Sequence, residues 1–253
     1  MSDPSLTRRR LLTGGALAAP ALLVGCDRLG RAPSFRSFLE LGETISYRVH
    51  RLLGSDALAR EYTEAEMSPD FRTNGNTSGS TEAWQRHAAN GFANWRLSVG
   101  GLVDQPLQLS LADLRSRPSR TQITRHDCVE GWSAIGQWTG APLGEILGEA
   151  GLRPEARYIV FRCADTFGFR PYYESIDLVD AFHPQTLLAY GMNGGDLPEG
   201  HGAPLRLRVE RQLGYKHAKF IMEVEAVESL GDIGNGRGGY WEDVGFYEWY
   251  AGI

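Results

Sequence analysis

The sequence predicts an α+β fold built on mixed sheets, and two observations carry that prediction. Stretches with strand composition alternate irregularly with short helical stretches, without the regular strand–helix–strand repeat of parallel α/β proteins. No GxxxxGK[ST] phosphate-binding motif occurs, which disfavours that class of nucleotide-binding fold. The chain has 253 residues and shows no internal repeat or low-complexity linker, so one principal domain is expected.

Residues 1–25 are predicted to be an export signal. Three arginines at positions 8–10 precede an apolar stretch at 11–24 that is shorter than the roughly 20 residues of a membrane-spanning helix. The arginines followed by Leu-Leu resemble a twin-arginine signal, which implies export of a folded protein. Residues 23–26 resemble a bacterial lipobox ending at Cys26; an ordinary signal cleaved nearby is the alternative. We expect a periplasmic protein, anchored at the inner membrane only through a lipidated Cys26.

An N-terminal helical segment, residues 26–67, is expected next. From about Ser34 to Leu53 apolar residues recur at three- and four-residue steps, which predicts an amphipathic helix. Its apolar stripe consists of Phe38, Leu41, Ile45, Val49 and Leu52. We interpret this stripe as a packing surface that takes no part in chemistry.

Residues 68–253 are predicted to form the functional domain. It opens with a polar loop rich in glycine and asparagine, residues 68–81, which is too long for a simple connector and is a candidate binding loop. Strands are predicted at WRLSVGGLV, TQITRHDC, RYIVFRC, LRLRV and KFIMEVEAV. Helices are predicted at SLADLRSR, with Ser110 and Asp113 as a capping box, and at PLGEILGEAG, closed by Gly151.

The charge balance argues against one class of partner. The chain carries 26 Lys and Arg against 31 Asp and Glu, a formal net charge of -5, and removal of residues 1–25 makes it about -7. A surface with this net charge repels a polyanion. No nucleic-acid partner is therefore expected.

Three cysteines, Cys26, Cys128 and Cys163, are too few for a disulfide-stapled scaffold. Cys128 stands at the end of a predicted strand, before a turn that contains glycine. A zinc site would need further Cys or His ligands at short spacing. A catalytic thiolate would need a distant histidine such as His201 and would be exposed to oxidation after export. A thiolate bound to a soft metal centre and a buried, inert cysteine are the other interpretations.

Residues 201–220, HGAPLRLRVERQLGYKHAKF, are strongly basic. A solvated basic face is the usual interpretation of such a run. Arg206, however, stands inside an apolar alternation that should bury part of it, and Gly202 and Gly214 allow backbone N–H groups to approach an anion closely. The run is therefore a candidate site for a phosphate-bearing ligand that forms many hydrogen bonds.

Four ordered motifs resemble the molybdopterin domain of the sulfite oxidase superfamily. They are CVEGWS at 128–133, LAYGMNG at 188–194, HGAPLR at 201–206, and GYK at 214–216 followed by Lys219. The likeness covers about Ser68 to the C-terminus, and the chain shows neither the haem domain nor the immunoglobulin-like dimerisation domain of sulfite oxidases. It is most similar to short exported bacterial members, such as the periplasmic methionine sulfoxide reductases.

The resemblance implies a molybdenum–molybdopterin cofactor, with Cys128 as the protein ligand to the metal and the catalytic centre. It places the cofactor contacts at Asn74, Gly75, Cys163, His201, Arg206, His217, Ala218 and Lys219. It also implies an oxidoreductase that transfers an oxygen atom, with reduction of a small S- or N-oxide or a methionine-sulfoxide-type substrate as the expected reaction. The sequence holds no CxxCH haem motif, so we expect an external electron-transfer partner, such as a membrane haem protein.

Two departures weaken sulfite oxidation as the activity. Sulfite oxidases carry an active-site tyrosine shortly after the position of Cys163, where this chain has ADTF, and an arginine at the position of Thr73. The asparagine–tyrosine–glutamate loop of the methionine sulfoxide enzymes is not reproduced either, so the substrate does not carry over directly. Sulfite oxidation and a non-catalytic, lipid-anchored binding protein of the same fold are the alternatives.

Two further expectations concern the surroundings of the centre. The resemblance implies that Cys163 faces the same cavity as Cys128; a buried apolar filler is the alternative. The aromatic stretch GGYWEDVGFYEWY at 238–250 is interpreted as packing, and a part in lining the substrate funnel is the alternative.

Overall fold

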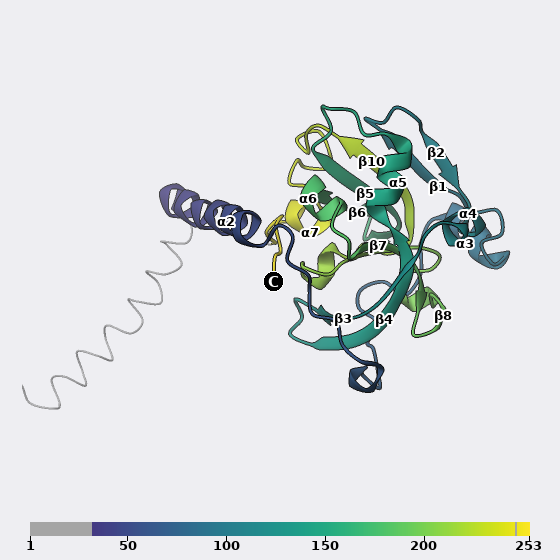
Figure 1. Ribbon diagram of the computed structural model, residues 1–253. Coiled ribbons are helices and arrows are strands. Elements are labelled where there is room, and N and C mark those ends of the chain that lie inside the picture. Colours follow the sequence, from purple (N-terminus) through teal and green to yellow (C-terminus); the bar gives the residue numbers. More distant parts are fainter. Residues whose placement is uncertain (1–31, 246) are drawn as a thin grey trace, which may run out of the picture. The chain divides into compact units, whose positions relative to one another are not determined.

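The computed structural model describes residues 32–245 and 247–253 (Figure 1). The chain divides into two units, one ending at Leu53 and the other running from Gly54 to Ile253. The predicted export signal and Cys26 lie outside the described residues. Among the described residues, no helix combines the length and the apolar character needed to cross a membrane.

The described part of the first unit is mainly helix α2, Pro33–Gly54, whose last residue is the first of the second unit. It confirms the predicted amphipathic helix, and its proline stands at the first helical position, where the missing N–H has no partner to lose. Leu41 and Ile45 of the apolar stripe are both 53% exposed, so the packing role of the stripe stays a prediction. Residues 54–67, which the sequence analysis groups with this helix, belong to the second unit.

The first sheet of the second unit is mixed. Its strand order is β2-β1-β10-β5-β6, with β1 and β10 parallel and the other neighbours antiparallel. The strands are β1 (Leu97–Gly101), β2 (Leu107–Leu109), β5 (Tyr158–Phe167), β6 (Arg170–Asp177) and β10 (Ile221–Val227).

The second sheet is antiparallel, with the order β3-β4-β7-β8 and β9 paired to β7. Its strands are β3 (Arg120–Asp127), β4 (Ser133–Pro142), β7 (Thr186–Met192), β8 (Gly195–Asp196) and β9 (Arg206–Val209). Since β9 belongs to this sheet and β10 to the other, residues 210–220 pass from one sheet to the other. The second half of the basic run, residues 210–220, is therefore the link between the two sheets.

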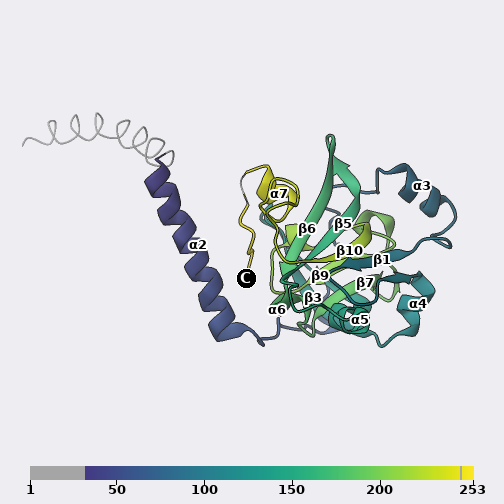
Figure 2. The same cartoon turned by 90° about the horizontal axis from the view of Figure 1, so that it is seen from above.

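Short helices connect the strands and lie around their margins (Figure 2). They are α3 (Glu82–Ala89), α4 (Leu111–Ser116), α5 (Leu143–Ala150), α6 (Leu178–Ala181) and α7 (Tyr240–Asp243), with 3-10 turns at Glu64–Glu66, Glu199–His201 and Gly214–Lys216. The capping box of α4 is confirmed, because Asp113 accepts from the Ser110 N–H and donates its own N–H to the Ser110 hydroxyl. Gly151 ends α5 in the left-handed region, with φ of 68°. The α+β prediction is confirmed.

One main core cluster draws on both sheets and on α5. It includes Leu97, Phe161 and Val224 of the first sheet, Leu188 and Leu207 of the second, and Ile146 and Leu147 of α5. A second cluster gathers Phe71, Trp138 and Met192 around β4. The strands that end at the candidate site are thus held by buried apolar contacts, which fix the loops they carry.

Candidate active site

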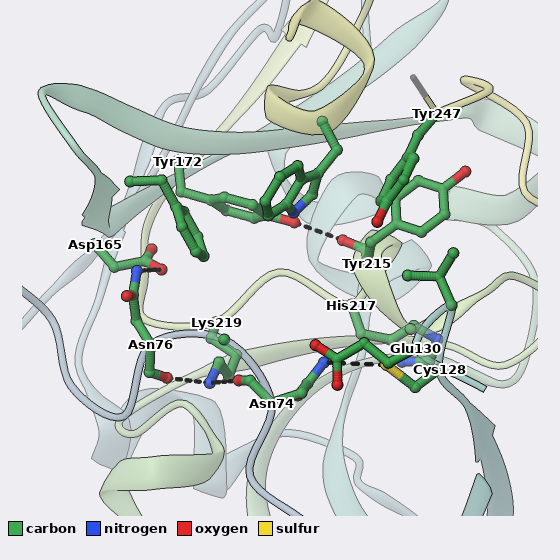
Figure 3. A pocket seen from close by; sticks show the side chains of 15 residues that line it. Asn74, Asn76, Cys128, Glu130, Asp165, Tyr172, Tyr215, His217, Lys219 and Tyr247 are labelled. Atoms are coloured by element: carbon green, nitrogen blue, oxygen red, sulfur yellow. Dashed lines mark hydrogen bonds between the residues drawn. The ribbon is translucent and has the colours of Figure 1, made fainter. Parts of the chain in front are cut away.

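One cavity brings together residues from five stretches of the second unit (Figure 3). These are the loop at 74–76, the turn at 128–130 after β3, the hairpin of β5 and β6, the link at 214–219, and the C-terminal stretch that follows β10. Five of the predicted site residues line this cavity: Asn74, Gly75, Cys128, His217 and Lys219. Cys163, His201, Arg206 and Ala218 do not line it. The predicted binding loop and the predicted metal ligand therefore meet.

Cys128 is held by the turn that follows β3. Its N–H donates to the Trp132 carbonyl at 2.9 Å, and the Gly131 N–H donates to the Cys128 carbonyl at 3.0 Å. The φ of Gly131 is 86°, a conformation that favours glycine. Asn74 Nδ2 lies 4.0 Å from the Cys128 sulfur. Burial is the largest influence on the thiol and raises the pKa of Cys128; a bound cation would offset this effect and favour the thiolate.

Lys219 fastens the early loop to the link between the sheets. Its ammonium donates to the Asn74 carbonyl at 2.7 Å, to the Asn76 carbonyl, and to the Gly200 carbonyl at 3.2 Å. Burial, and after it the charge of Arg206, lowers the pKa of Lys219 to about 7. An anion bound nearby would offset both effects and stabilise the ammonium.

Arg206 and His201 carry buried nitrogen atoms that lack partners. Arg206 Nη1 donates to the His201 carbonyl at 3.1 Å, whereas Arg206 Nε and Nη2 and His201 Nδ1 have no partner. Burial and the Arg208 charge lower the pKa of Arg206 to about 9; burial and the Arg206 charge lower the pKa of His201 to about 4. Buried donors without acceptors are unfavourable. The oxygens of a phosphate group would supply those acceptors.

Gly202 allows Arg206 and Lys219 to come close together. Its φ is 115°, and a Cβ at this position would lie 3.0 Å from the Lys219 side chain and 3.3 Å from that of Arg206. Any other residue would be strained and would push the two cations apart. The position explains why the HGAPLR motif carries glycine after its histidine.

The remaining cations of the basic run have carboxylate partners. Arg208 donates to both oxygens of Glu210 at 2.9 and 2.6 Å, and Arg211 donates to Asp180 at 2.6 Å. Lys216 lies 2.6 Å from an oxygen of Glu174 and from one of Glu242. Among the described residues of this run, Arg206 and Lys219 are the buried cations without a carboxylate. Arg206 therefore has free donors for an anionic ligand, whereas the Lys219 ammonium is engaged by backbone carbonyls and would contribute its charge.

His217 and Ala218 stand between these cations. The His217 Nε2 lies 3.0 Å from the Gln212 carbonyl and must donate to it, which leaves Nδ1 as a buried acceptor without a partner. Burial lowers the pKa of His217 well below its usual value, so the ring is neutral. The Ala218 carbonyl accepts from the Leu207 N–H at 2.8 Å, which fixes this stretch against β9. The neutral acceptor of His217 fits an N–H group of a pterin.

Cys163 is not among the residues that line the cavity of Cys128. Its thiol belongs to the main core cluster and lines a separate hollow beside Tyr173 and Ile233, outside the cavity of Cys128. Strand alternation would put Cys163 and Asp165 on one face, but the ladder between β5 and β6 is interrupted between Arg162 and Thr166, and Asp165 alone reaches the cavity. The two hollows share Tyr172, and both the shared cavity and a cofactor contact of Cys163 stay predictions.

Two acidic residues of the cavity were not anticipated. Glu130 accepts from Trp132 Nε1 at 3.0 Å, and Asp165 accepts from Asn76 Nδ2 at 3.0 Å while its Oδ1 is buried without a partner. Burial raises the pKa of Asp165. Glu130 could have been found, since it lies within the CVEGWS motif. Asp165 was visible only as part of the ADTF stretch that replaces the expected tyrosine.

The aromatic C-terminal stretch also reaches the cavity. Trp241 and Tyr247 line it together with Phe167, Tyr172 and Tyr215. The composition of this stretch predicts packing, but the alternative interpretation, a part in lining the substrate funnel, describes these two residues better. The signal was present in the composition of the stretch, but nothing in it showed which rings would turn toward the cavity.

Lys219 allows a first prediction, on the pH dependence of stability. The pKa of Lys219 is about 7 in the folded chain against about 10.4 in an unfolded one. Between these values the unfolded chain binds the additional proton, so the contribution of Lys219 to the free energy of unfolding rises with pH, by at most about 1.4 kcal/mol per pH unit. In urea unfolding of the cofactor-free protein, the wild type should gain stability relative to Lys219→Met from pH 7 to 10. A difference that stays constant over this range, as expected for the exposed control Arg115→Met, would contradict the prediction.

Comparison with known proteins gives a consistent match. A family model described as "Oxidoreductase molybdopterin binding domain" matches residues 85–231. The chain is 39% identical over 244 residues to YedZ1 of Azospira oryzae, which is provisionally named a protein-methionine-sulfoxide reductase subunit; the match covers 96% of this chain and 86% of that one. It is 42% identical over 147 residues to the protein-methionine-sulfoxide reductase catalytic subunit MsrP of Xanthomonas axonopodis pv. citri. That match covers 54% of this chain and 46% of MsrP, so the chain spans about half the length of this relative.

A solved structure supports the fold. The sulfane dehydrogenase SoxCD from Paracoccus pantotrophus is similar with a TM-score of 0.50 and 25% sequence identity, over 54% of this chain and 39% of that one. The mixed first sheet and the antiparallel second sheet are thus those of a sulfite oxidase-like, molybdopterin-binding fold.

Proposed function

This chain belongs to the family of oxidoreductase molybdopterin-binding domains, and from that premise we propose that it reduces a neutral sulfoxide. The family makes it a molybdenum–molybdopterin oxidoreductase. The relatives named above are protein-methionine-sulfoxide reductase subunits, which supports an S-oxide as substrate. The observation that carries the proposal is the charge of the cavity around Cys128.

The residues present fit the cofactor. Cys128 supplies the thiolate ligand, and Arg206, His201 and Lys219 would hold the phosphate and polar edges of the pterin. Each charge-assisted hydrogen bond of this kind contributes about 1.5–3 kcal/mol. When bound, the group supplies oxygen-atom transfer at its metal. The protein's own task is to bind and orient it, with Asn74 and Gly75 held in place by the Lys219 ammonium.

The cavity disfavours an anionic substrate such as sulfite. Two carboxyl side chains, Glu130 and Asp165, line it, and among the described lining residues there is no arginine. Arg72, which lies within the early loop, is exposed and does not line the cavity. Lys219 is the one cationic lining residue, and its ammonium is engaged by three carbonyl groups. A neutral sulfoxide carries no charge for the two carboxyl groups to repel, whereas sulfite does.

The proposal extends to location and electron supply. The arginine-rich, apolar N-terminus supports export in the folded state to the periplasm, with anchoring at the inner membrane through a lipidated Cys26. The name of MsrP calls it a catalytic subunit, which supports a second protein as the electron donor. A non-catalytic binding role is less well supported, because a binding protein would have no use for a cavity thiol beside two cations without carboxylate partners.

The test compares neutral and anionic substrates on the cofactor-loaded enzyme. With a reduced viologen dye as donor, we expect turnover of dimethyl sulfoxide and of N-acetylmethionine sulfoxide amide. With ferricyanide as acceptor, we expect no sulfite-dependent reduction. Sulfite oxidation at a higher kcat/KM than sulfoxide reduction would refute the proposed reaction and leave the family assignment intact.

A further inference from the structure

Rings from the C-terminal stretch, from the β5–β6 hairpin and from Tyr215 form one continuous wall of the cavity. Successive ring centroids lie 4.7 Å apart for Tyr215 and Tyr247, 5.5 Å for Tyr247 and Trp241, and 5.2 Å for Trp241 and Phe167. Tyr172 extends the series, 5.7 Å from Phe167. Tyr172, Tyr215 and Tyr247 lie across the cavity from Cys128, Asn74 and Lys219 (Figure 3). The cavity therefore has a polar side and an aromatic side.

The aromatic side offers ring surface and few hydroxyl donors. The Tyr172 hydroxyl donates to the Tyr215 carbonyl at 2.6 Å, and the Tyr215 hydroxyl donates to the Glu248 carbonyl at 2.6 Å. With these two hydroxyl groups engaged by the backbone, the wall can bind alkyl and thioether groups through dispersion and sulfur–aromatic contacts.

A buried ion cluster fixes the wall in place. Lys216 joins Glu242 of α7 to Glu174 of β6, at 2.6 Å in each case, and all three side chains are at most 1% exposed. Lys216 directly precedes His217 and follows Tyr215. Residues 214–219 therefore supply both the predicted cofactor-binding side chains His217 and Lys219 and the lysine that holds the aromatic wall. The distance between the polar and the aromatic sides of the cavity is set by these few residues.

We propose that Trp241 and Tyr247 determine substrate specificity by binding the methyl and methylene groups beside the sulfoxide, so that the enzyme selects a methyl alkyl sulfoxide of the methionine-sulfoxide type. The inference rests on the proposed sulfoxide reduction. The polar side of the cavity holds the cofactor and the S=O group faces it, while the alkyl arms contact the rings. The side chain of methionine sulfoxide, with one polar S=O group and two alkyl arms, matches a cavity with one polar and one aromatic side better than a small anion does.

The experiment removes rings one at a time and measures binding separately from turnover. Tyr247→Ser and Trp241→Ser should raise the KM for N-acetylmethionine sulfoxide amide by about tenfold, the effect of losing contact with one or two methylene groups, while kcat changes less than threefold. The Kd of N-acetylmethionine sulfone amide, which resembles the substrate but is not a sulfoxide, should rise by a similar factor in a calorimetric titration. Tyr247→Phe restores the ring and should recover most of the binding.

Trp249→Phe is the matched control, since Trp249 lies in the same stretch, donates to Ser175 at 2.8 Å and does not line the cavity. All variants are compared at equal molybdenum content. Unchanged KM and sulfone Kd in both serine variants of a sulfoxide-reducing enzyme would overturn this inference alone. A wild type that reduces no sulfoxide would instead overturn the proposed function.

Discussion

Replacement of Cys128 by serine is expected to abolish sulfoxide reduction. Cys128 is the sulfur that the described residues place in the cavity, and the turn of Gly131 and Trp132 holds it there. A serine hydroxyl is a hard and weakly acidic ligand that replaces a thiolate poorly on a soft metal centre. Changes around a metal's ligands cost about 10–100-fold in activity, so loss of the ligand itself should exceed that range.

The cofactor itself should remain bound in this variant. Arg206, His201 and Lys219 lie on other stretches and are untouched by the substitution, so pterin content measured after denaturing extraction should stay close to that of the wild type. Thr121→Ser is the matched control, because Thr121 lies on β3, the strand that leads to Cys128, and does not line the cavity. Full activity in Cys128→Ser would refute the assignment of the ligand.

Replacement of Arg206 by methionine should have opposite effects on stability and on cofactor loading. The guanidinium is buried with Nε and Nη2 unpartnered, so an apolar side chain of similar length should stabilise the cofactor-free protein, by about 1–3 kcal/mol in urea unfolding. The same change removes charge-assisted bonds to the phosphate worth about 1.5–3 kcal/mol each. Cofactor affinity should therefore fall by roughly ten- to a hundredfold per bond lost.

Loading is measured as molybdenum and pterin per protein after purification from the same expression conditions. Arg115→Met, at an exposed arginine paired with Asp196, controls for the loss of one positive charge. Equal cofactor content in Arg206→Met and the wild type would show that this guanidinium does not bind the phosphate. If cofactor-free Arg206→Met were less stable than the cofactor-free wild type, the Nε and Nη2 atoms of Arg206 would have hydrogen-bond partners in solution.

The sequence predicted well what depends on local pattern. The capping box of Ser110, the helix end at Gly151 and strands such as β3 and β10 follow from residues next to one another. Strand β4 was missed, because Gly136 and Gly140 interrupt its apolar pattern. It forms because β3 and β7 pair with it on both sides, which is a tertiary effect that overrides local propensity.

The candidate site was predicted through motifs, and the errors arose where a residue's partner is distant in sequence. Lys216 and Lys219 look alike in the basic run, yet Lys216 is paired with Glu174 and Glu242 and Lys219 with backbone carbonyls. No spacing rule distinguishes them. Asp165 was not singled out because the irregularity in the β5–β6 ladder, which brings it to the cavity, has no signature in the residues themselves.

The anchoring of the aromatic wall by Lys216 also indicates where new substrate preferences could arise. Positions 214–219 serve the cofactor and the wall at once, so a substitution there must satisfy two partners and will rarely be neutral. Positions 241 and 247 face the cavity, whereas Glu242 forms the buried ion pair with Lys216 that holds the wall in place. A mutational library aimed at other sulfoxides should therefore vary Trp241 and Tyr247 and leave Lys216, Glu174 and Glu242 unchanged. Natural divergence among related chains would be expected to follow the same division.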